Sequence, residues 1–126
     1  MEQALSVATF AIVPARASLV DLMATTDVLA MAEASGVPHL IVLNAVPSSG
    51  KSGNQAQAIL TGQKAPVAGT IVHQRQSYVV GLNAGKSAAE VNAGRDKAAA
   101  SEIDALWREI KAATIAAAKK KARARR

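Results

Sequence analysis

The residues with the clearest chemical potential in this 126-residue chain lie in two glycine-lysine-serine sequences. Gly81–Ser87 reads GLNAGKS, one residue shorter than the G-x-x-x-x-G-K-[ST] loop, whose successive backbone N–H groups wrap a phosphate. The preceding Gln74–Ser77 is polar and makes a poor feeding strand for such a loop. The second sequence, Gly50–Ser52, has Ala45 where the loop needs its first glycine. Both places therefore read as ordinary glycine- and serine-rich connections, with Gly81–Ser87 the nearer to a nucleotide loop.

Groups for other kinds of catalysis are scarce. The chain has no cysteine, which excludes disulfides, thiolate zinc sites and cysteine nucleophiles. Its two histidines, His39 and His73, have no carboxylate or second histidine at metal-ligand spacing. No serine lies in a G-x-S-x-G sequence. We therefore predict no catalytic residue and no metal site, and we expect His39 to be structural.

Positive charge is concentrated at the end of the chain. The net charge is +6, and residues 119–126 contain six basic and no acidic side chains: Lys119, Lys120, Lys121, Arg123, Arg125 and Arg126. Such a cluster attracts polyanions, because each phosphate that it neutralises releases condensed counterions. We therefore divide the chain into a neutral body, residues 1–118, and a basic tail that contacts DNA without sequence preference. A solvated tail that only improves solubility is the alternative.

The first half of the chain alternates short apolar runs with a longer helical pattern. Val7–Val13 is nearly all apolar and ends at Pro14, as a buried parallel strand does. Ser18 and Asp21 have the spacing of an acidic capping box, which predicts a helix from Ser18 to about Ser35. Gly36 and Pro38 then stop that helix.

The alternation continues in the second half. We predict strands over His39–Asn44 and Val67–Val72, and helices over Asn54–Leu60, Arg75–Ala84 and from about Asp96 to the tail. We expect apolar side chains at helical spacing to form one face of the last helix. On the exposed side we expect a pair of opposite charges, in which the acidic Asp104 precedes the basic Arg108 by four positions. The predicted apolar face comprises Ile103, Leu106, Trp107, Ile110 and Thr114.

This alternation predicts an α/β fold with a partial parallel sheet flanked by helices and a long C-terminal helix. Three strands make a narrow parallel sheet, and no helix is expected before the first, so the chain reads as part of a larger sheet. No basic leader or run of roughly 20 apolar residues is present, which predicts a cytoplasmic protein without membrane contact.

Asn44 ends the second predicted strand. Open α/β sheets bind ligands at the carboxyl ends of their strands, and an amide offers a donor and an acceptor to a base edge. By this chemistry alone, a simple loop-starting role is the stronger interpretation of Asn44.

Four sequence blocks in order resemble the C-terminal half of ParA/MinD-type partition ATPases. They are FAIVPARASLVDLMATTDVL, HLIVLNAVPSSGK, VAGTIVHQRQSY with the following Gly85-Lys-Ser and Glu90, and SEIDALWREI. Together they cover about residues 5–112. The resemblance implies the C-terminal part of a P-loop NTPase fold, within a family that binds ATP and magnesium, dimerises, binds DNA non-specifically and responds to a ParB-like partner.

The family's phosphate-binding loop and aspartate motif lie upstream of the first matching block. The resemblance therefore implies a truncated, nucleoid-associated partition protein with little or no ATPase activity and no cofactor of its own. Asn44 matches the family asparagine near the adenine, and Pro14 and Asp21 match positions close to the nucleotide. Lys51 and Arg75 match basic positions on the DNA-facing surface, which the basic tail would extend. Two alternatives remain: half of an ATPase completed in trans by an N-terminal partner, or a small non-catalytic interaction domain.

Overall fold

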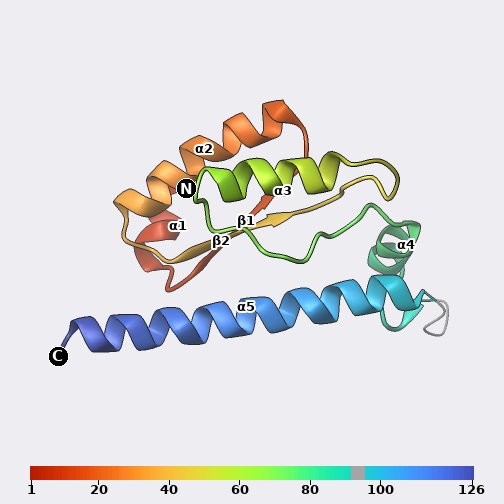
Figure 1. The fold of residues 1–126 in the computed structure, drawn as a ribbon. Coiled ribbons are helices and arrows are strands. Elements are labelled where there is room, and N and C mark those ends of the chain that lie inside the picture. The colour runs from red at the N-terminus through yellow and green to blue at the C-terminus, as the bar shows by residue number, and fades with distance from the viewer. Residues whose placement is uncertain (92–95) are drawn as a thin grey trace.

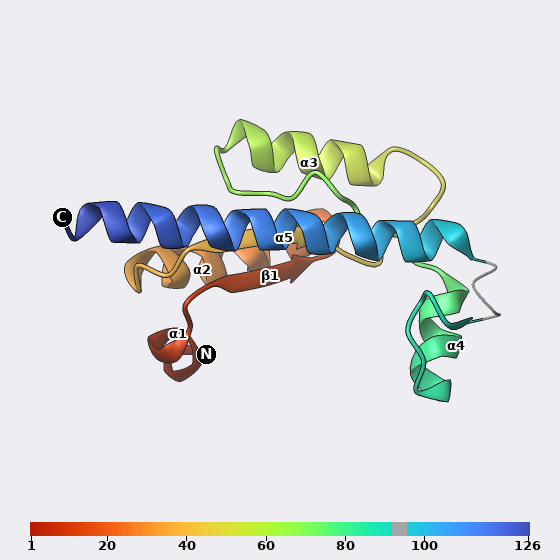
Figure 2. The ribbon, with the colours of Figure 1, turned by 90° about the horizontal axis from the view of Figure 1, so that it is seen from below.

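The computed structural model describes residues 1–91 and 96–126 as a mixed α/β structure. Figure 1 shows α2 and α3 on one side of the two strands, and Figures 1 and 2 together show α5 running along the other side. The elements in chain order are α1 (Glu2–Val7), β1 (Ala11–Ala15), α2 (Leu19–Ala34), β2 (His39–Leu43), α3 (Ser52–Gly62), α4 (Gln76–Ala84) and α5 (Lys97–Ala124).

The sheet consists of β1 and β2, which are parallel and in register from Ala11 opposite His39 to Ala15 opposite Leu43. Alternate residues of both strands enter the main core, where they meet Leu22 of α2 and Leu60 of α3. This core contains Val13, Ala15, Leu22, Ile41, Leu43, Val46, Ala56 and Leu60. The predicted parallel sheet and long C-terminal helix are therefore confirmed, with a smaller sheet than expected.

The predicted third strand, Val67–Val72, is wrong as a continuous strand. The segment follows the free edge of β2, but it makes only single bridges, Ile41 with Val67 and Val46 with His73. Ile41 accepts from the N–H of Ala68 at 2.8 Å, and Leu43 accepts from the N–H of Val72 at 2.9 Å. The two donor residues are therefore four positions apart, whereas a regular ladder places them two apart, so this segment has two residues more than the ladder needs. We call the residues between the two donors, 69–71, the 69–71 bulge.

The bulge exists because neighbouring helices bind its backbone. The N–H groups of Gly69 and Thr70 donate to the carboxylate of Glu109 in α5, at 2.8 and 2.7 Å. From α3, the Gln57 amide donates to the carbonyls of Ala68 and Gly69. These bonds give the N–H groups of Gly69 and Thr70 and the carbonyls of Ala68 and Gly69 partners outside the sheet.

The first strand also differs from the prediction. It begins at Ala11 rather than Val7, and α1 precedes it, so the expectation that no helix lies ahead of the first strand is wrong. Leu5 holds α1 in place by burying its side chain. The register directs the backbone groups of Ile12 and Pro14 away from β2. Proline lacks an N–H, so Pro14 is suited to this outer edge.

The helix boundaries follow the predicted start and stop residues closely. The hydroxyl of Ser18 accepts from the N–H of Asp21 at 3.1 Å and caps α2, while Gly36 and Gly85 end α2 and α4 with φ of 68° and 66°. The short predicted helix Asn54–Leu60 is extended at both ends as α3.

In α5, the predicted apolar face is partly wrong. Ile103 and Trp107 are 42% and 60% exposed, whereas Leu106 packs on a second core formed by Val42, Ala68 and Val72. Ile110 and Thr114 are half-buried, as predicted. The inner face also carries two acidic side chains, Glu102 and Glu109, which accept hydrogen bonds from residues 69–78. The exposed pair Asp104–Arg108 is confirmed, with 2.9 Å between Nη2 and Oδ2.

The helix also continues through the boundary that we predicted at residues 118 and 119. It is capped by Asp96, whose carboxylate accepts from the N–H of Ala99 at 3.1 Å, and it ends at Ala124. The basic tail is thus largely the last part of α5.

The Gly81–Ser87 sequence has the opposite context from a phosphate-binding loop. Such a loop precedes a helix, whereas Gly81 lies inside α4 and Gly85 ends that helix. Gly81 is required for packing: a Cβ there would lie 2.7 Å from the carbonyl oxygen of Lys86 and 2.8 Å from Val91. Only Gly85–Ser87 therefore form the predicted connection, since residues 81–84 belong to α4.

We therefore expect Gly81→Ala to destabilise the fold by about 1–3 kcal/mol, because the added methyl group overlaps backbone that cannot easily move. Urea unfolding followed by circular dichroism measures this loss. Gly62→Ala is the matched control, since nothing lies within 4 Å of the position that its added methyl group would take, and it should raise stability by less than about 1 kcal/mol. Equal effects of the two substitutions would contradict the packing role.

Candidate functional site

A cavity of about 360 Å³ lies at the carboxyl ends of β1 and β2. Its lining brings together Pro14, Asp21 and Asn44, the three residues that the resemblance places near a nucleotide. The other lining residues are Val13, Ala15, Arg16, Ala24, Thr25 and Val28. This is the place where open parallel sheets bind ligands.

The backbone around the cavity is held by local hydrogen bonds. The N–H of Asn44 donates to the carbonyl of Ala15 at 2.8 Å, which ties the end of β2 to the end of β1. In the first turns of α2, the hydroxyl of Thr25 donates to the carbonyl of Asp21 at 2.8 Å, and Ser18 donates to the Asp21 carboxylate. Two walls of the cavity are therefore preformed.

The charges around the cavity nearly balance. Arg16 and Asp21 contribute one charge of each sign, and Val13, Ala15 and Val28 contribute apolar surface. An apolar cleft with one amide and few charges suits a flat neutral group better than a triphosphate. Sequence reasoning missed Arg16, although its position directly after a strand that ends at the ligand edge was a usable signal.

The second glycine-lysine-serine sequence has the strand–loop–helix context that the first lacks. It joins β2 to α3. Ala45, at the position of the loop's first glycine, adopts a positive φ of 51°. However, the N–H of Val46 already donates to Val72 at 3.2 Å, and Pro47 has no N–H. This loop therefore lacks the run of free N–H groups that wraps a phosphate.

The basic residues predicted to face DNA fall into different environments. Lys51 is exposed immediately before α3. Arg75 is paired with Glu102, with 2.8 Å between Nη2 and Oε2. The six basic residues of the tail are exposed, and this end of α5 extends past the other elements in both Figure 1 and Figure 2.

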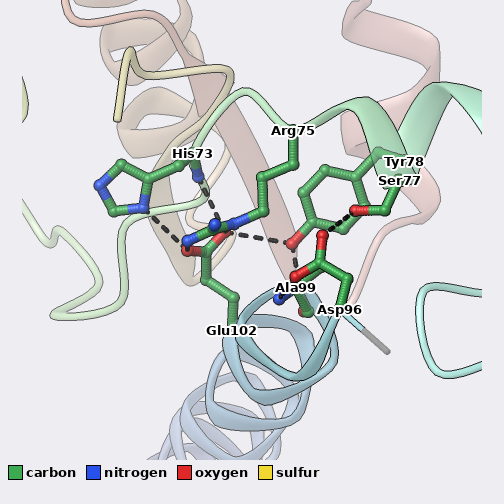
Figure 3. Close-up of polar contacts among 7 residues, drawn as sticks. All are labelled: His73, Arg75, Ser77, Tyr78, Asp96, Ala99 and Glu102. Atoms are coloured by element: carbon green, nitrogen blue, oxygen red, sulfur yellow. Dashed lines mark hydrogen bonds and ion pairs between the residues drawn. The ribbon is translucent and has the colours of Figure 1, made fainter. Parts of the chain in front are cut away.

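Glu102 is the centre of a polar cluster that sequence reasoning did not find (Figure 3). Its side chain is 10% exposed and accepts from the N–H of His73 at 2.9 Å, from the Arg75 guanidinium and from the Tyr78 hydroxyl at 3.1 Å. The Nδ1 atom of His73 lies 2.8 Å from its second oxygen. Beside this cluster, Ser77 donates to the Asp96 carboxylate that caps α5.

Two pKa values record the strength of these contacts. Burial alone would raise the pKa of Glu102, but the hydrogen bonds from Arg75, His73 and Tyr78 outweigh it and lower that pKa to about 2. Burial, followed by the charge and hydrogen bond of Glu102, raises the pKa of Tyr78 to about 12. The cluster therefore favours an ionised glutamate beside a neutral tyrosine.

Within residues 1–91 and 96–126, no group of three or more histidine and carboxylate side chains could hold a metal ion. The helices in this part of the chain also include none with the length and apolar character to cross a membrane. No family model matches the chain, and no curated protein is significantly similar to it.

We expect Glu102→Gln to lower the stability at neutral pH by roughly 1–3 kcal/mol, because hydrogen bonds to a charged acceptor are weakened. Since the folded pKa of Glu102 lies below its ordinary value of 4.5, its contribution is present above about pH 4.5 and is lost as the pH falls towards 2. Urea unfolding between pH 7 and pH 3 should therefore show a smaller acid loss in the variant than in the wild type.

The single tyrosine gives an independent readout of the same contact. Tyrosinate absorbance should titrate near pH 12 in the wild type, and at lower pH in Glu102→Gln, because the negative charge beside the hydroxyl is removed. Glu33→Gln, at an exposed position of α2, is the control. An unchanged tyrosine titration in Glu102→Gln would show that the cluster does not form.

Proposed function

We propose that this chain acts in DNA partition as a ParA-like protein that binds DNA non-specifically through the C-terminal end of α5. The supporting observation is the placement of the charge: six exposed basic residues in the last eight lie on a helix end that extends away from the body. Phosphate contacts of this kind bind DNA without reading its sequence.

The cavity at the ends of β1 and β2 supports a role for a nucleoside. The Asn44 amide can pair with a base edge, and the apolar wall residues can cover a base plane. We propose that the cavity takes the adenosine part of a nucleotide. The triphosphate would have no phosphate-binding loop among residues 1–126, so we expect little or no ATP hydrolysis by this chain alone.

The family resemblance extends the proposal to partners. A ParB-like protein and a second nucleotide-bound subunit are the partners expected for a ParA-like chain, and the nucleoid is the expected location.

Neutralising the end of α5 should reduce DNA affinity and its dependence on salt. The change is the replacement of Lys119, Lys120, Lys121, Arg123, Arg125 and Arg126 by glutamine. If all six contact phosphates, the slope of log affinity against log salt should flatten by about 5 units, because each contact contributes about 0.9. Fluorescence anisotropy with two unrelated duplexes, at several salt concentrations, measures the slope and the sequence preference.

The control is Lys64→Gln combined with Lys111→Gln, which removes exposed positive charge away from the helix end. We expect the control to keep most of the salt slope, and both duplexes to bind equally. DNA affinity that is unaffected by salt, or by the loss of all six charges, would rule out the proposed interface.

Asn44→Ala should remove nucleoside binding. We expect adenosine to raise the melting temperature of the wild type, since a ligand that binds only the folded state stabilises it by about 1.4 kcal/mol at ten times its Kd. Differential scanning fluorimetry with adenosine and with cytidine measures the shift and its base preference. Asn83→Ala, an exposed asparagine in α4, is the matched control and should behave as the wild type. Equal shifts in all three proteins would refute the assignment of Asn44.

A further inference from the structure

The inner face of α5 presents two carboxylates, Glu102 and Glu109, to the segment of residues 69–78. The two residues are seven positions apart, which places them about 10 Å apart along the helix. Residues 69–78 include Arg75 and no acidic side chain. The α5 side of this contact therefore carries the negative charges, and the side of residues 69–78 carries a positive charge and hydrogen-bond donors.

Glu109 occupies a site built mainly from backbone. The N–H of Gly69 donates to Oε2 at 2.8 Å, the N–H of Thr70 donates to Oε1 at 2.7 Å, and the Thr70 hydroxyl also donates to Oε1. The 69–71 bulge makes this possible, because it turns two successive N–H groups away from β2. Successive N–H groups that converge on one point form an anion-binding site.

Glu102 occupies a second site with stronger positive charge. The Arg75 guanidinium, the His73 N–H and the Tyr78 hydroxyl all point at its carboxylate (Figure 3). Guanidinium groups and backbone N–H groups bind phosphate oxygens with the same geometry as carboxylate oxygens. The two sites are therefore chemically suited to oxyanions in general.

Apolar packing holds α5 only weakly. Of its 28 residues, Ala99 alone is buried, and the large apolar residues Leu106 and Ile110 are half-buried, with Leu106 on the second core. Ile103 and Trp107 point into solvent instead of adding to the contact. Since buried apolar area is the main source of docking energy, the attachment of α5 depends on its two carboxylates to an unusual extent.

We propose that residues 69–78 form a receptor for phosphate-type oxyanions, which α5 fills with the carboxylates of Glu102 and Glu109. A phosphate group, free or in a nucleic-acid backbone, competes with α5 for these donors. Binding at the receptor releases α5 from the sheet. This site is separate from the cavity at Asn44 and from the basic end of α5, so it does not depend on the proposed function.

The test uses the double variant Glu102→Gln/Glu109→Gln, which keeps the side-chain shape and removes both negative charges. Inorganic phosphate is titrated at constant pH and ionic strength while the amide signals of Gly69, Thr70 and His73 are followed by NMR. We expect saturable shifts in the variant at a phosphate concentration at least tenfold lower than in the wild type. Equal midpoints, or no saturable shift in the variant, would overturn the proposal.

Two further measurements keep the test decisive. Glu2→Gln/Glu33→Gln removes two exposed carboxylates and should titrate as the wild type does. If circular dichroism shows that the double variant is unfolded, Glu109→Gln alone exposes the Gly69 and Thr70 half of the receptor, and the same criteria apply to those two signals.

A final arm distinguishes the two sources of phosphate. A short oligonucleotide without terminal phosphates is titrated into the double variant with its six basic tail residues also replaced by glutamine. Shifts of the Gly69, Thr70 and His73 signals would support a receptor that accepts a nucleic-acid backbone. Shifts with inorganic phosphate alone would support a receptor for free phosphate.

Discussion

The buried carboxylate of Glu102 is the interaction on which the arrangement of the C-terminal half depends. It joins three donors from residues 73–78, including Tyr78 of α4, to the first turns of a helix that has little apolar contact with the body. A charge at this depth is stable only if hydrogen bonds compensate for its lost hydration. Arg75, His73 and Tyr78 provide them, and in doing so they determine where α5 lies.

A similar exchange of backbone partners shapes the sheet. The segment after α3 follows β2 but leaves it at Gly69, because Glu109 and Gln57 supply alternative partners for its N–H and carbonyl groups. On the opposite side, Pro14 removes an N–H from the outer edge of β1. Both edges of the two-stranded sheet are thus modified by particular side chains, and the cavity lies where the two strands end.

Two acidic residues of α5, Glu102 and Glu109, face the body, whereas Asp104 and the basic residues at the end of the helix face solvent. This separation is consistent with a helix that is held by donors within the chain and that offers its positive end to a polyanion. The proposed DNA interface and the proposed oxyanion receptor therefore lie on one element, at positions that experiments can separate.

Local sequence signals determined much of the fold. The Ser18 cap, Gly36 and Gly85 mark helix ends because each acts through neighbouring backbone, and the apolar runs locate β2 and most of β1. Asn44 was placed correctly at the end of β2 for the same reason. These features depend on residues within a few positions of one another, so the sequence alone was sufficient to predict them.

Contacts between distant residues decided the rest. No periodicity could show that Glu109 would draw Gly69 and Thr70 out of the sheet, because they lie 40 and 39 positions from it in the chain. Hydrophobic spacing predicted that Trp107 would lie on the inner face of α5. Glu102 lies there instead, because hydrogen-bond donors on residues 73–78 bind its carboxylate. Likewise, the sequence named Pro14, Asp21 and Asn44 separately, and only the parallel pairing of β1 with β2 brought them to one cavity.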